Sequence, residues 1–107
     1  MAVFKTTILT LEEAAFEDKV DSLVVPGLNG RFGVLAGHAP LVAALQAGIL
    51  KIGKGLETIY FVTGDGMINI SHEGVLILAE AAIKCSGDFD AEEKLEAYIR
   101  ASSPVPV

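Results

Sequence analysis

The sequence has little that would support disulfide bonding or nucleic-acid binding. It contains a single cysteine, Cys85, which excludes an internal disulfide and fits a reducing compartment. Eight Lys and Arg residues stand against fourteen Asp and Glu residues, for a net charge of −6, and the basic residues are scattered. Because nucleic acids are bound by clustered positive charge, we expect no nucleic-acid partner.

Long apolar runs are also missing. No stretch approaches the roughly 18 apolar residues that span a bilayer. The N-terminus lacks the basic start, apolar run and small-residue cleavage site of a secretion signal. We therefore expect a soluble, cytoplasmic chain without direct membrane insertion. Its 107 residues are 51% hydrophobic and 21% charged, which suggests one domain with a large core or a surface that another protein covers.

Short β-prone runs separated by turn signals fill the chain up to residue 79. They span residues 3–11, 14–20, 20–25, 31–35, 40–45, 48–53, 58–64, 67–71 and 74–79. Asp65-Gly66 is a hairpin signal between two of these runs, and we expect most of the eleven glycines at turns and bulges with positive φ. The spacing predicts an all-β sandwich of antiparallel strands and argues against alternating strands and helices.

The C-terminal residues follow a different pattern. Asp90 is placed to cap a helix, with Glu93 in the capping-box position. Three apolar residues then fall on one helical face: Leu95, Tyr98 and Ile99. We predict a helix of about eleven residues that must pack on the sandwich or a partner, because it is marginal alone. The chain thus divides into a sandwich, 1–87, and a short helix with a Pro-containing tail, 88–107.

Glycine-rich segments do not match known phosphate-binding loops. Gly53-Lys54 is followed by glycine instead of the serine or threonine of a P-loop. The segment GLNGRFG, residues 27–33, has the wrong spacing for a dinucleotide fingerprint and leads into more strand. We therefore expect no bound nucleotide or other cofactor.

Candidate catalytic and metal-binding side chains are few. His38, His72 and Cys85 lack the paired spacing of a metal site. Ser71-His72-Glu73 cannot form a catalytic relay, because consecutive residues near a strand point to opposite faces. We predict no catalytic residue and no metal site, with His72 in an exposed loop and Cys85 a half-buried, inert thiol.

His38 lies in the uncharged segment 36–45 and admits two interpretations. It is either a loop histidine that satisfies backbone groups near a turn, or a polar contact on a small-residue surface that another subunit covers. The sequence alone leaves both open.

The motif order resembles the epsilon subunit of F-type ATP synthase, called delta in mitochondria. The shared segments are VDSLVVPG, NG-x-FGVL, GHAPLVAAL, GILKI, FVTGDG and VLILAE, and the resemblance covers about residues 3–85. It implies a ten-stranded β-sandwich in the central rotor stalk, peripheral to the cytoplasmic face of a bacterial inner membrane. Such a subunit is not an enzyme itself. It couples ion-driven rotation to ATP synthesis in the alpha/beta catalytic head.

The resemblance also implies two contact regions. The gamma subunit would be contacted by Thr10, His38, Ala39, Pro40, Leu41, Val42 and Ala43. The c-ring would be contacted by Leu28, Asn29, Gly30 and Arg31. The family usually has Glu where this chain has Arg31, so charge complementarity asks for an acidic or neutral ring loop opposite it.

The C-terminal region departs from the family pattern. Members commonly continue into a hairpin of two long helices that inhibits ATP hydrolysis, and some bind ATP through an I/L-D-x-x-R-A motif. Here the segment 89–93 reads FDAEE, with Glu93 where the motif needs Arg. We expect a shortened helical region with a natural end at SSPVPV, without ATP binding or extended-helix inhibition.

Three other functions stay open at this point. A regulatory ATP-sensing epsilon subunit would show a melting temperature that shifts with ATP. A free-standing β-sandwich ligand-binding module would need a concave pocket with a few polar groups. A small metal-dependent enzyme would lose function when metal is removed.

Overall fold

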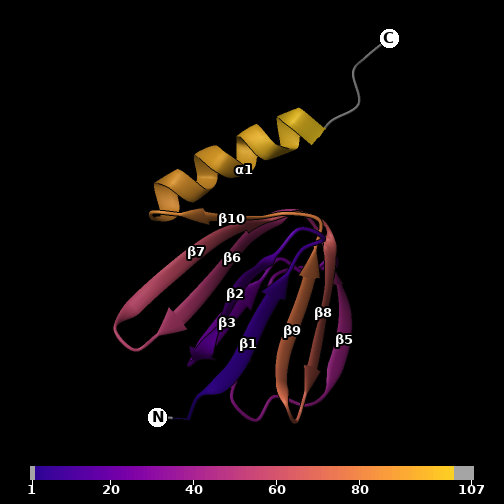
Figure 1. Cartoon of the computed structure of the whole chain (residues 1–107), viewed down its shortest axis with the longest axis vertical. Coiled ribbons are helices and arrows are strands. Elements are labelled where there is room, and N and C mark those ends of the chain that lie inside the picture. The colour runs from indigo at the N-terminus through magenta and orange to yellow at the C-terminus, as the bar shows by residue number, and fades with distance from the viewer. Residues whose placement is uncertain (1, 103–107) are drawn as a thin grey trace.

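The computed structural model describes residues 2–102, which form ten strands in two five-stranded sheets and one helix (Figure 1). In order across sheet A the strands are β2 (Ala14–Val20), β1 (Phe4–Leu9), β9 (Gly74–Ala79), β8 (Gly66–Ser71) and β5 (Leu41–Leu45). In order across sheet B they are β10 (Ala82–Cys85), β7 (Glu57–Thr63), β6 (Gly48–Lys54), β3 (Ser22–Val25) and β4 (Phe32–Leu35). The predicted all-β sandwich with one C-terminal helix is confirmed.

Strand direction differs from the prediction at one place. The strands pair antiparallel except that β1 pairs parallel with β9, where Thr6 lies opposite Val75. Nine strands correspond to the nine β-prone runs. The tenth, β10, was not among them, because its sequence AIKC has only one β-branched or aromatic residue, whereas the two other four-residue strands, SLVV and FGVL, have two each.

Alternating side chains of the two sheets meet between them and form the core. In β3 the pattern is regular, with Leu23 and Val25 buried and the residues between them partly exposed. The largest fully buried apolar side chains are Ile8, Leu23, Leu50, Ile52, Ile68 and Ile77. Burying each such side chain stabilises the fold by roughly 1.5–3 kcal/mol. Phe16 of sheet A and Phe61 of sheet B meet edge to face across the core, with ring centroids 5.8 Å apart.

Asp65-Gly66 does not form the predicted hairpin. This dipeptide carries the chain from β7 in sheet B to β8 in sheet A. Both sides of β7 are already paired, with β6 and with β10, so β8 must pair elsewhere. The Asp65 carboxylate accepts a 2.8 Å hydrogen bond from the N–H of Ala47 and thereby fixes the crossing. The prediction of a turn at Asp65-Gly66 was correct, but the predicted pairing of the two strands that it joins, β7 and β8, was wrong.

Fewer than half of the glycines adopt the left-handed conformation, and several others allow close packing. Positive φ occurs at four of the eleven: Gly30, Gly37, Gly55 and Gly74. At Gly66 an added Cβ would lie only 1.9 Å from the carbonyl oxygen of Leu78. The expectation that most glycines have positive φ was therefore wrong, because close backbone approach also selects glycine and leaves no mark in a sequence.

The helix α1 (Asp88–Ser102) is longer than predicted and begins two residues before Asp90. Asp90 therefore lies in the first turn, where its carboxylate accepts a 2.8 Å hydrogen bond from the Ser86 N–H. This bond, together with a 3.0 Å ion pair to Lys94, holds the pKa of Asp90 below its usual value. Asp90 thus makes the reach-back contact predicted for Glu93.

The predicted tail after Ser102 lies outside the described residues. Within residues 2–102, no helix is long and apolar enough to cross a membrane.

One face of α1 packs on the outer face of sheet B. Ala91 is fully buried against Val62 and Cys85, and Leu95 and Tyr98 pack beside it, as predicted for the last two. The prediction for Ile99 was wrong, since its side chain is 47% exposed. Burial raises the pKa of the Cys85 thiol, which donates a hydrogen bond to the Ile83 carbonyl oxygen.

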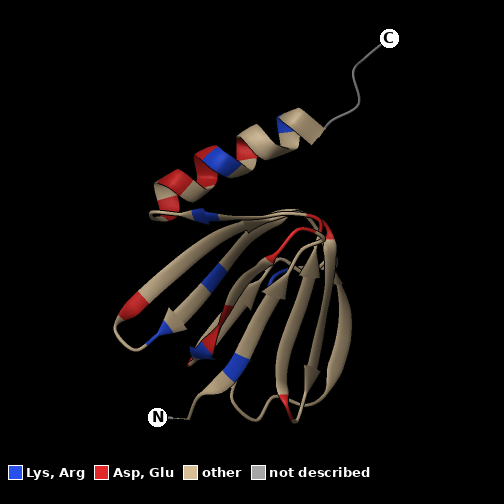
Figure 2. Cartoon of the chain, in the orientation of Figure 1, with Lys and Arg blue, Asp and Glu red and all other residues tan. Residues whose placement is uncertain are grey.

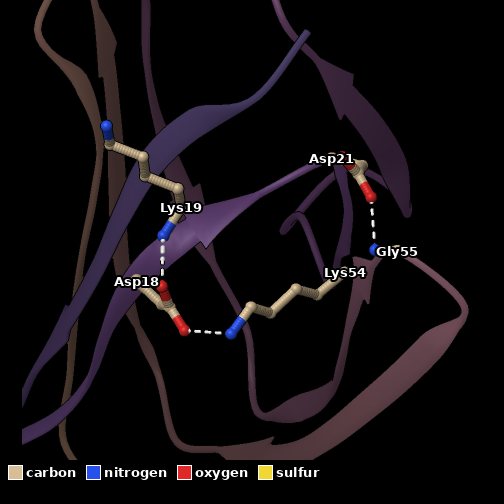
Figure 3. A network of polar contacts seen from close by, with 5 residues as sticks. All are labelled: Asp18, Lys19, Asp21, Lys54 and Gly55. Atoms are coloured by element: carbon tan, nitrogen blue, oxygen red, sulfur yellow. Dashed lines mark hydrogen bonds and ion pairs between the residues drawn. The ribbon is translucent and has the colours of Figure 1, made fainter. Parts of the chain in front are cut away.

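A polar network joins the two sheets along one edge (Figure 3). Asp18 on β2 pairs with Lys54 at the end of β6, and Asp21 accepts a hydrogen bond from the N–H of Gly55. Asp18 also accepts from the N–H of Lys19. The Lys54 ammonium lowers the pKa of Asp18, and Asp18 in turn raises the pKa of Lys54. The network links β2, an edge strand of sheet A, to β6, the middle strand of sheet B.

Candidate docking surface

Two cross-strand rows place apolar side chains on the outer face of sheet A. In the first row Leu9, Leu78, Met67 and Ala44 lie opposite one another on four adjacent strands. In the second, Leu76 and Val42 alternate with Thr7 and Asn69. Four strands spaced about 4.8 Å apart make these rows roughly 14 Å wide. We call this surface the apolar face, which comprises Leu9, Val42, Ala44, Met67, Leu76 and Leu78.

The apolar face is exposed in the described part of the chain. Met67 and Leu78 are each 40% exposed and Val42 is 60% exposed. The helix packs on β6, β7 and β10 of the other sheet and leaves this face open (Figure 1). Figure 2 shows β5, β8 and β9 without charged residues along their lengths. A contiguous apolar patch of this kind is typical of a protein–protein contact.

His38 lies at one end of the apolar face, in the loop before β5. Its Nδ1 is 2.7 Å from the carbonyl oxygen of Ala39, and because a carbonyl only accepts, Nδ1 carries the proton. With Ala39 and Pro40 it lines a cavity of about 600 Å³ that the β8–β9 turn and the start of β1 complete. His38 therefore satisfies a backbone group, as one interpretation held. The half-buried ring also stays open to a partner.

The loop Leu28–Arg31 lies at the opposite end of β5. The N–H of Leu28 donates a 2.9 Å hydrogen bond to the carbonyl oxygen of Ala44, near the end of that strand. A second cavity, of about 580 Å³, is lined by residues 27–32 and 42–44. Since β5 has five residues, roughly 13–17 Å separate this loop from His38. Val42 and Ala43 thus share a cavity with the residues assigned to the ring, not with His38.

Thr10 lies far from His38 along sheet A, although the resemblance assigns both residues to the gamma contact. It follows Leu9, which lies opposite Leu78, so Thr10 aligns with the end of β5 and not with its start. Its hydroxyl accepts hydrogen bonds from the N–H groups of Glu12 and Glu13 and so shapes the β1–β2 turn. Thr10 and His38 therefore flank the apolar face from opposite ends, while Val42, which is also assigned to gamma, belongs to the face itself.

Sequence reasoning missed five members of the apolar face: Leu9, Ala44, Met67, Leu76 and Leu78. Each of these residues follows or precedes a buried core residue on its strand. The two-residue repeat that assigns side chains to opposite faces of a strand was therefore visible in the sequence. The outward positions are themselves apolar, which is unusual for a strand with one solvated face. Apolar residues at outward positions could be seen in residues 67–71 (MINIS) and 75–79 (VLILA). Only the order of strands in the sheet shows that these residues lie side by side.

The side chains offer little chemistry beyond packing and pairing. Among the described residues, no group of three or more His, Cys, Asp and Glu side chains is placed to hold a metal ion. Ser71 accepts a hydrogen bond from the N–H of Glu73 in the β8–β9 turn, where His72 is exposed as predicted. His38 and Cys85 lie in different clusters, in the β4–β5 loop and under the helix.

Comparison with known proteins agrees with this architecture. The family profile "ATP synthase, Delta/Epsilon chain, beta-sandwich domain" matches residues 3–85. The ATP synthase epsilon chain of Dehalococcoides mccartyi is 37% identical over 103 residues, covering 96% of this chain and 73% of that protein. The same subunit of Bradyrhizobium sp. (strain ORS 278) is 44% identical over 82 residues, covering 77% and 61%.

Two solved assemblies contain chains of similar fold. A chain of the Euglena gracilis mitochondrial ATP synthase, solved as OSCP/F1/c-ring, superposes with a TM-score of 0.76 at 26% identity, covering all of this chain and 69% of that one. A chain of the Tetrahymena thermophila central stalk and c-ring gives a TM-score of 0.62 at 10% identity, over 92% and 90%. The second likeness concerns the fold alone.

Proposed function

The chain belongs to the ATP synthase delta/epsilon family, and on that basis we propose that it is a non-catalytic subunit of the central rotor stalk. It binds the gamma subunit and the c-ring and couples ion-driven rotation to ATP synthesis in the alpha/beta head. It works at the cytoplasmic face of the membrane as a peripheral member of the complex.

The observation that carries this proposal is the apolar face of sheet A. A single domain gains nothing from apolar side chains aligned on four strands in water, whereas a partner that covers them removes their area from solvent. The core of a protein–protein interface has this composition, with charge depleted at its centre. We assign the gamma subunit as the partner that covers the apolar face, because the chain belongs to the delta/epsilon family.

Thr10 and His38 fit the same arrangement. They lie near opposite ends of sheet A, so a gamma surface that covers the whole outer face meets both. Leu41 and Val42, 38% and 60% exposed, lie between these ends on the edge strand β5. The loop Leu28–Arg31 projects beyond β5 and is assigned to the c-ring.

A lysine at the centre of the apolar face tests the gamma contact. Met67→Lys is tolerated in the free chain, because lysine extends its ammonium into water from a position already 40% exposed. In the complex the ammonium is buried without a partner, which costs more than about 1.4 kcal/mol, or tenfold in affinity. Binding of the full-length variant to purified gamma is measured by surface plasmon resonance.

The matched control is Leu56→Lys at the tip of the β6–β7 hairpin. Leu56 is fully exposed and belongs to sheet B, so this change adds the same charge away from the apolar face. We expect wild-type gamma affinity for Leu56→Lys and a clear loss for Met67→Lys. Equal affinities for the two variants would place the gamma contact on another surface.

A further inference from the structure

Lys5 and Lys19 place two like charges side by side on the outer face of sheet A. They lie directly opposite each other on β1 and β2, where the Cβ atoms of paired residues are roughly 5 Å apart. Glu17 pairs with Lys5 at 3.4 Å, but Lys19 is exposed and makes no ion pair within residues 2–102. Like charges directly opposite each other destabilise a sheet. An anion bound beside the two ammonium groups offsets this repulsion.

The two lysines border the cavity that His38 lines. This cavity of about 600 Å³ lies where the β4–β5 loop, the β8–β9 turn and the start of β1 meet. His72 also lines it, and Glu73 is the one acidic residue among the described residues around it. Its apolar walls include three buried side chains: Val34, Ile70 and Val75. In a chain with a net charge of −6, this is a local excess of basic groups around an apolar recess, and such a recess suits a small anionic molecule.

The rim of this cavity is held in place before any ligand binds. The His38 N–H donates a 3.1 Å hydrogen bond to the Leu35 carbonyl oxygen, and Gly37 between them takes a positive φ of 83°. A Cβ at Gly74 would lie 2.5 Å from the Lys5 carbonyl oxygen, so the β8–β9 turn lies directly against β1. A preformed rim lowers the ordering cost of binding.

The tautomer of His38 narrows the class of anion. Its Nδ1 donates to the Ala39 carbonyl oxygen at 2.7 Å, so in the neutral ring Nε2 has no proton and accepts a hydrogen bond. A phosphate monoester supplies the matching O–H, because its second ionisation lies at about pH 6 and its monoanion keeps one proton. A carboxylate has already lost its proton at neutral pH. The cavity therefore favours a phosphate monoester over a carboxylate.

We propose that this cavity binds a soluble organic phosphate in which a phosphate monoester is joined to an apolar group. The ammonium groups of Lys5 and Lys19 pair with the phosphate oxygens, and Nε2 of His38 accepts the phosphate O–H. The apolar group lies against the apolar walls. The loop assigned to the c-ring lies at the opposite end of β5, which favours a soluble ester over a lipid headgroup. Binding does not depend on the proposed rotor function, although the choice of a soluble source does.

The test is an NMR titration of the isotope-labelled full-length chain with phenyl phosphate, which joins a phosphate monoester to an apolar ring. We expect saturable shifts of the backbone amide signals of Gly37, His72 and Gly74, which lie around the cavity. Phenyl sulfate has a similar shape but lacks the O–H and the second ionisation, so we expect binding weaker by about tenfold or more. The absence of saturable shifts with phenyl phosphate overturns the proposal, and equal affinity for phenyl sulfate overturns the assignment to phosphate.

Lys19→Gln removes the cation that makes no ion pair. We expect the affinity for phenyl phosphate to fall about tenfold or more, while the melting temperature does not fall, because repulsion from Lys5 is relieved. Lys51→Gln is the matched control, since Lys51 is exposed on β6 of the other sheet, and we expect it to bind like the wild type. Equal affinities of the two variants would place the ligand elsewhere and overturn the proposal.

Vesicles test the source of the phosphate. Phosphatidic acid carries a phosphate monoester as its headgroup, so flotation of the chain with phosphatidic acid vesicles is compared with flotation with phosphatidylcholine vesicles. We expect the chain to float with neither. Flotation with phosphatidic acid that Lys19→Gln abolishes would make a lipid headgroup the ligand and overturn the assignment to a soluble ester. Neither gamma nor the c-ring is present in these experiments, so their failure is distinguishable from failure of the proposed rotor function.

Discussion

Gly66 shows how a single residue controls the junction between the two sheets. It opens β8 directly after the crossing from sheet B, and it lies opposite Ala79 on β9. A Cβ at this position would lie 1.9 Å from the Leu78 carbonyl oxygen and 2.9 Å from the Ala79 Cα, both of them backbone atoms that cannot rotate away. Only glycine lets the two strands approach this closely.

We predict that Gly66→Ala lowers the free energy of unfolding by on the order of 3 kcal/mol, because β8 and β9 must separate to admit the methyl group. Gly33→Ala is the control, since Gly33 is also a strand glycine but the nearest neighbour of its Cβ, the Leu23 carbonyl oxygen, would be at 3.7 Å. That change should alter stability by less than about 0.5 kcal/mol. Urea unfolding of both variants measures the difference, and equal stabilities would contradict this account of Gly66.

The role of a residue was predictable from the sequence where it depends on residues adjacent in the chain. It was not predictable where it depends on packing against residues distant in the chain. The exposed loop position of His72 follows from its immediate neighbours, whereas the burial of Cys85 depends on Val62, which is distant along the chain, and on Ala91 of the helix. The contact between His38 and Ala39 is equally local. The role of Gly66 depends on Leu78, twelve residues away, and no propensity rule anticipates that distance. The cavity beside Arg31 depends likewise on β5.

At the scale of elements, α1 is an amphipathic helix whose docking rests on few residues. Ala91 is fully buried on Val62 and Cys85, and Tyr98 reaches Gly64, where an added Cβ would lie 2.4 Å from its hydroxyl. The opposite face carries acidic residues and Arg100 in water (Figure 2). A helix of 15 residues is marginal by itself, so its order depends on this contact.

We predict that Ala91→Gln detaches the helix from the sandwich, because the longer side chain cannot fit between the helix and β7 and leaves its amide unsatisfied. Amide hydrogen exchange in residues 91–100 should become about tenfold faster or more, while the strands keep their protection. Ala97→Gln is the matched control on the exposed face and should leave exchange unchanged. Slow exchange in both variants would mean that Ala91 does not anchor the helix.

Strands were predictable as elements but their partners were not. Alternation and turn residues marked nine of the ten strands, because these signals lie within each short segment. Pairing follows from the whole topology, which explains the misread hairpin at Asp65-Gly66 and the parallel pair β1 and β9. The helix start was misplaced for a similar reason, since Asp90 and Glu93 are both acidic and only the geometry shows which one reaches back.

The whole molecule has two unlike sides. One sheet is covered by the helix, and the other presents an apolar face with Arg31 and its cavity at one end and His38 at the other. The sequence alone predicted an apolar-rich chain with an uncharged central stretch. It could not show that Leu9, Met67 and Leu78 join that stretch, since they are distant along the chain and meet only through the sheet order.

The central claim is that this chain is a rotor-stalk subunit docked through sheet A. The most direct measurement is affinity purification of the tagged full-length chain from its own membranes, solubilised in a detergent that keeps the synthase intact, with partners identified by mass spectrometry. The account predicts recovery of gamma, the alpha/beta head and the c-ring subunit with the wild-type chain, and their loss with Met67→Lys. Recovery of none of these subunits with the wild-type chain would contradict it.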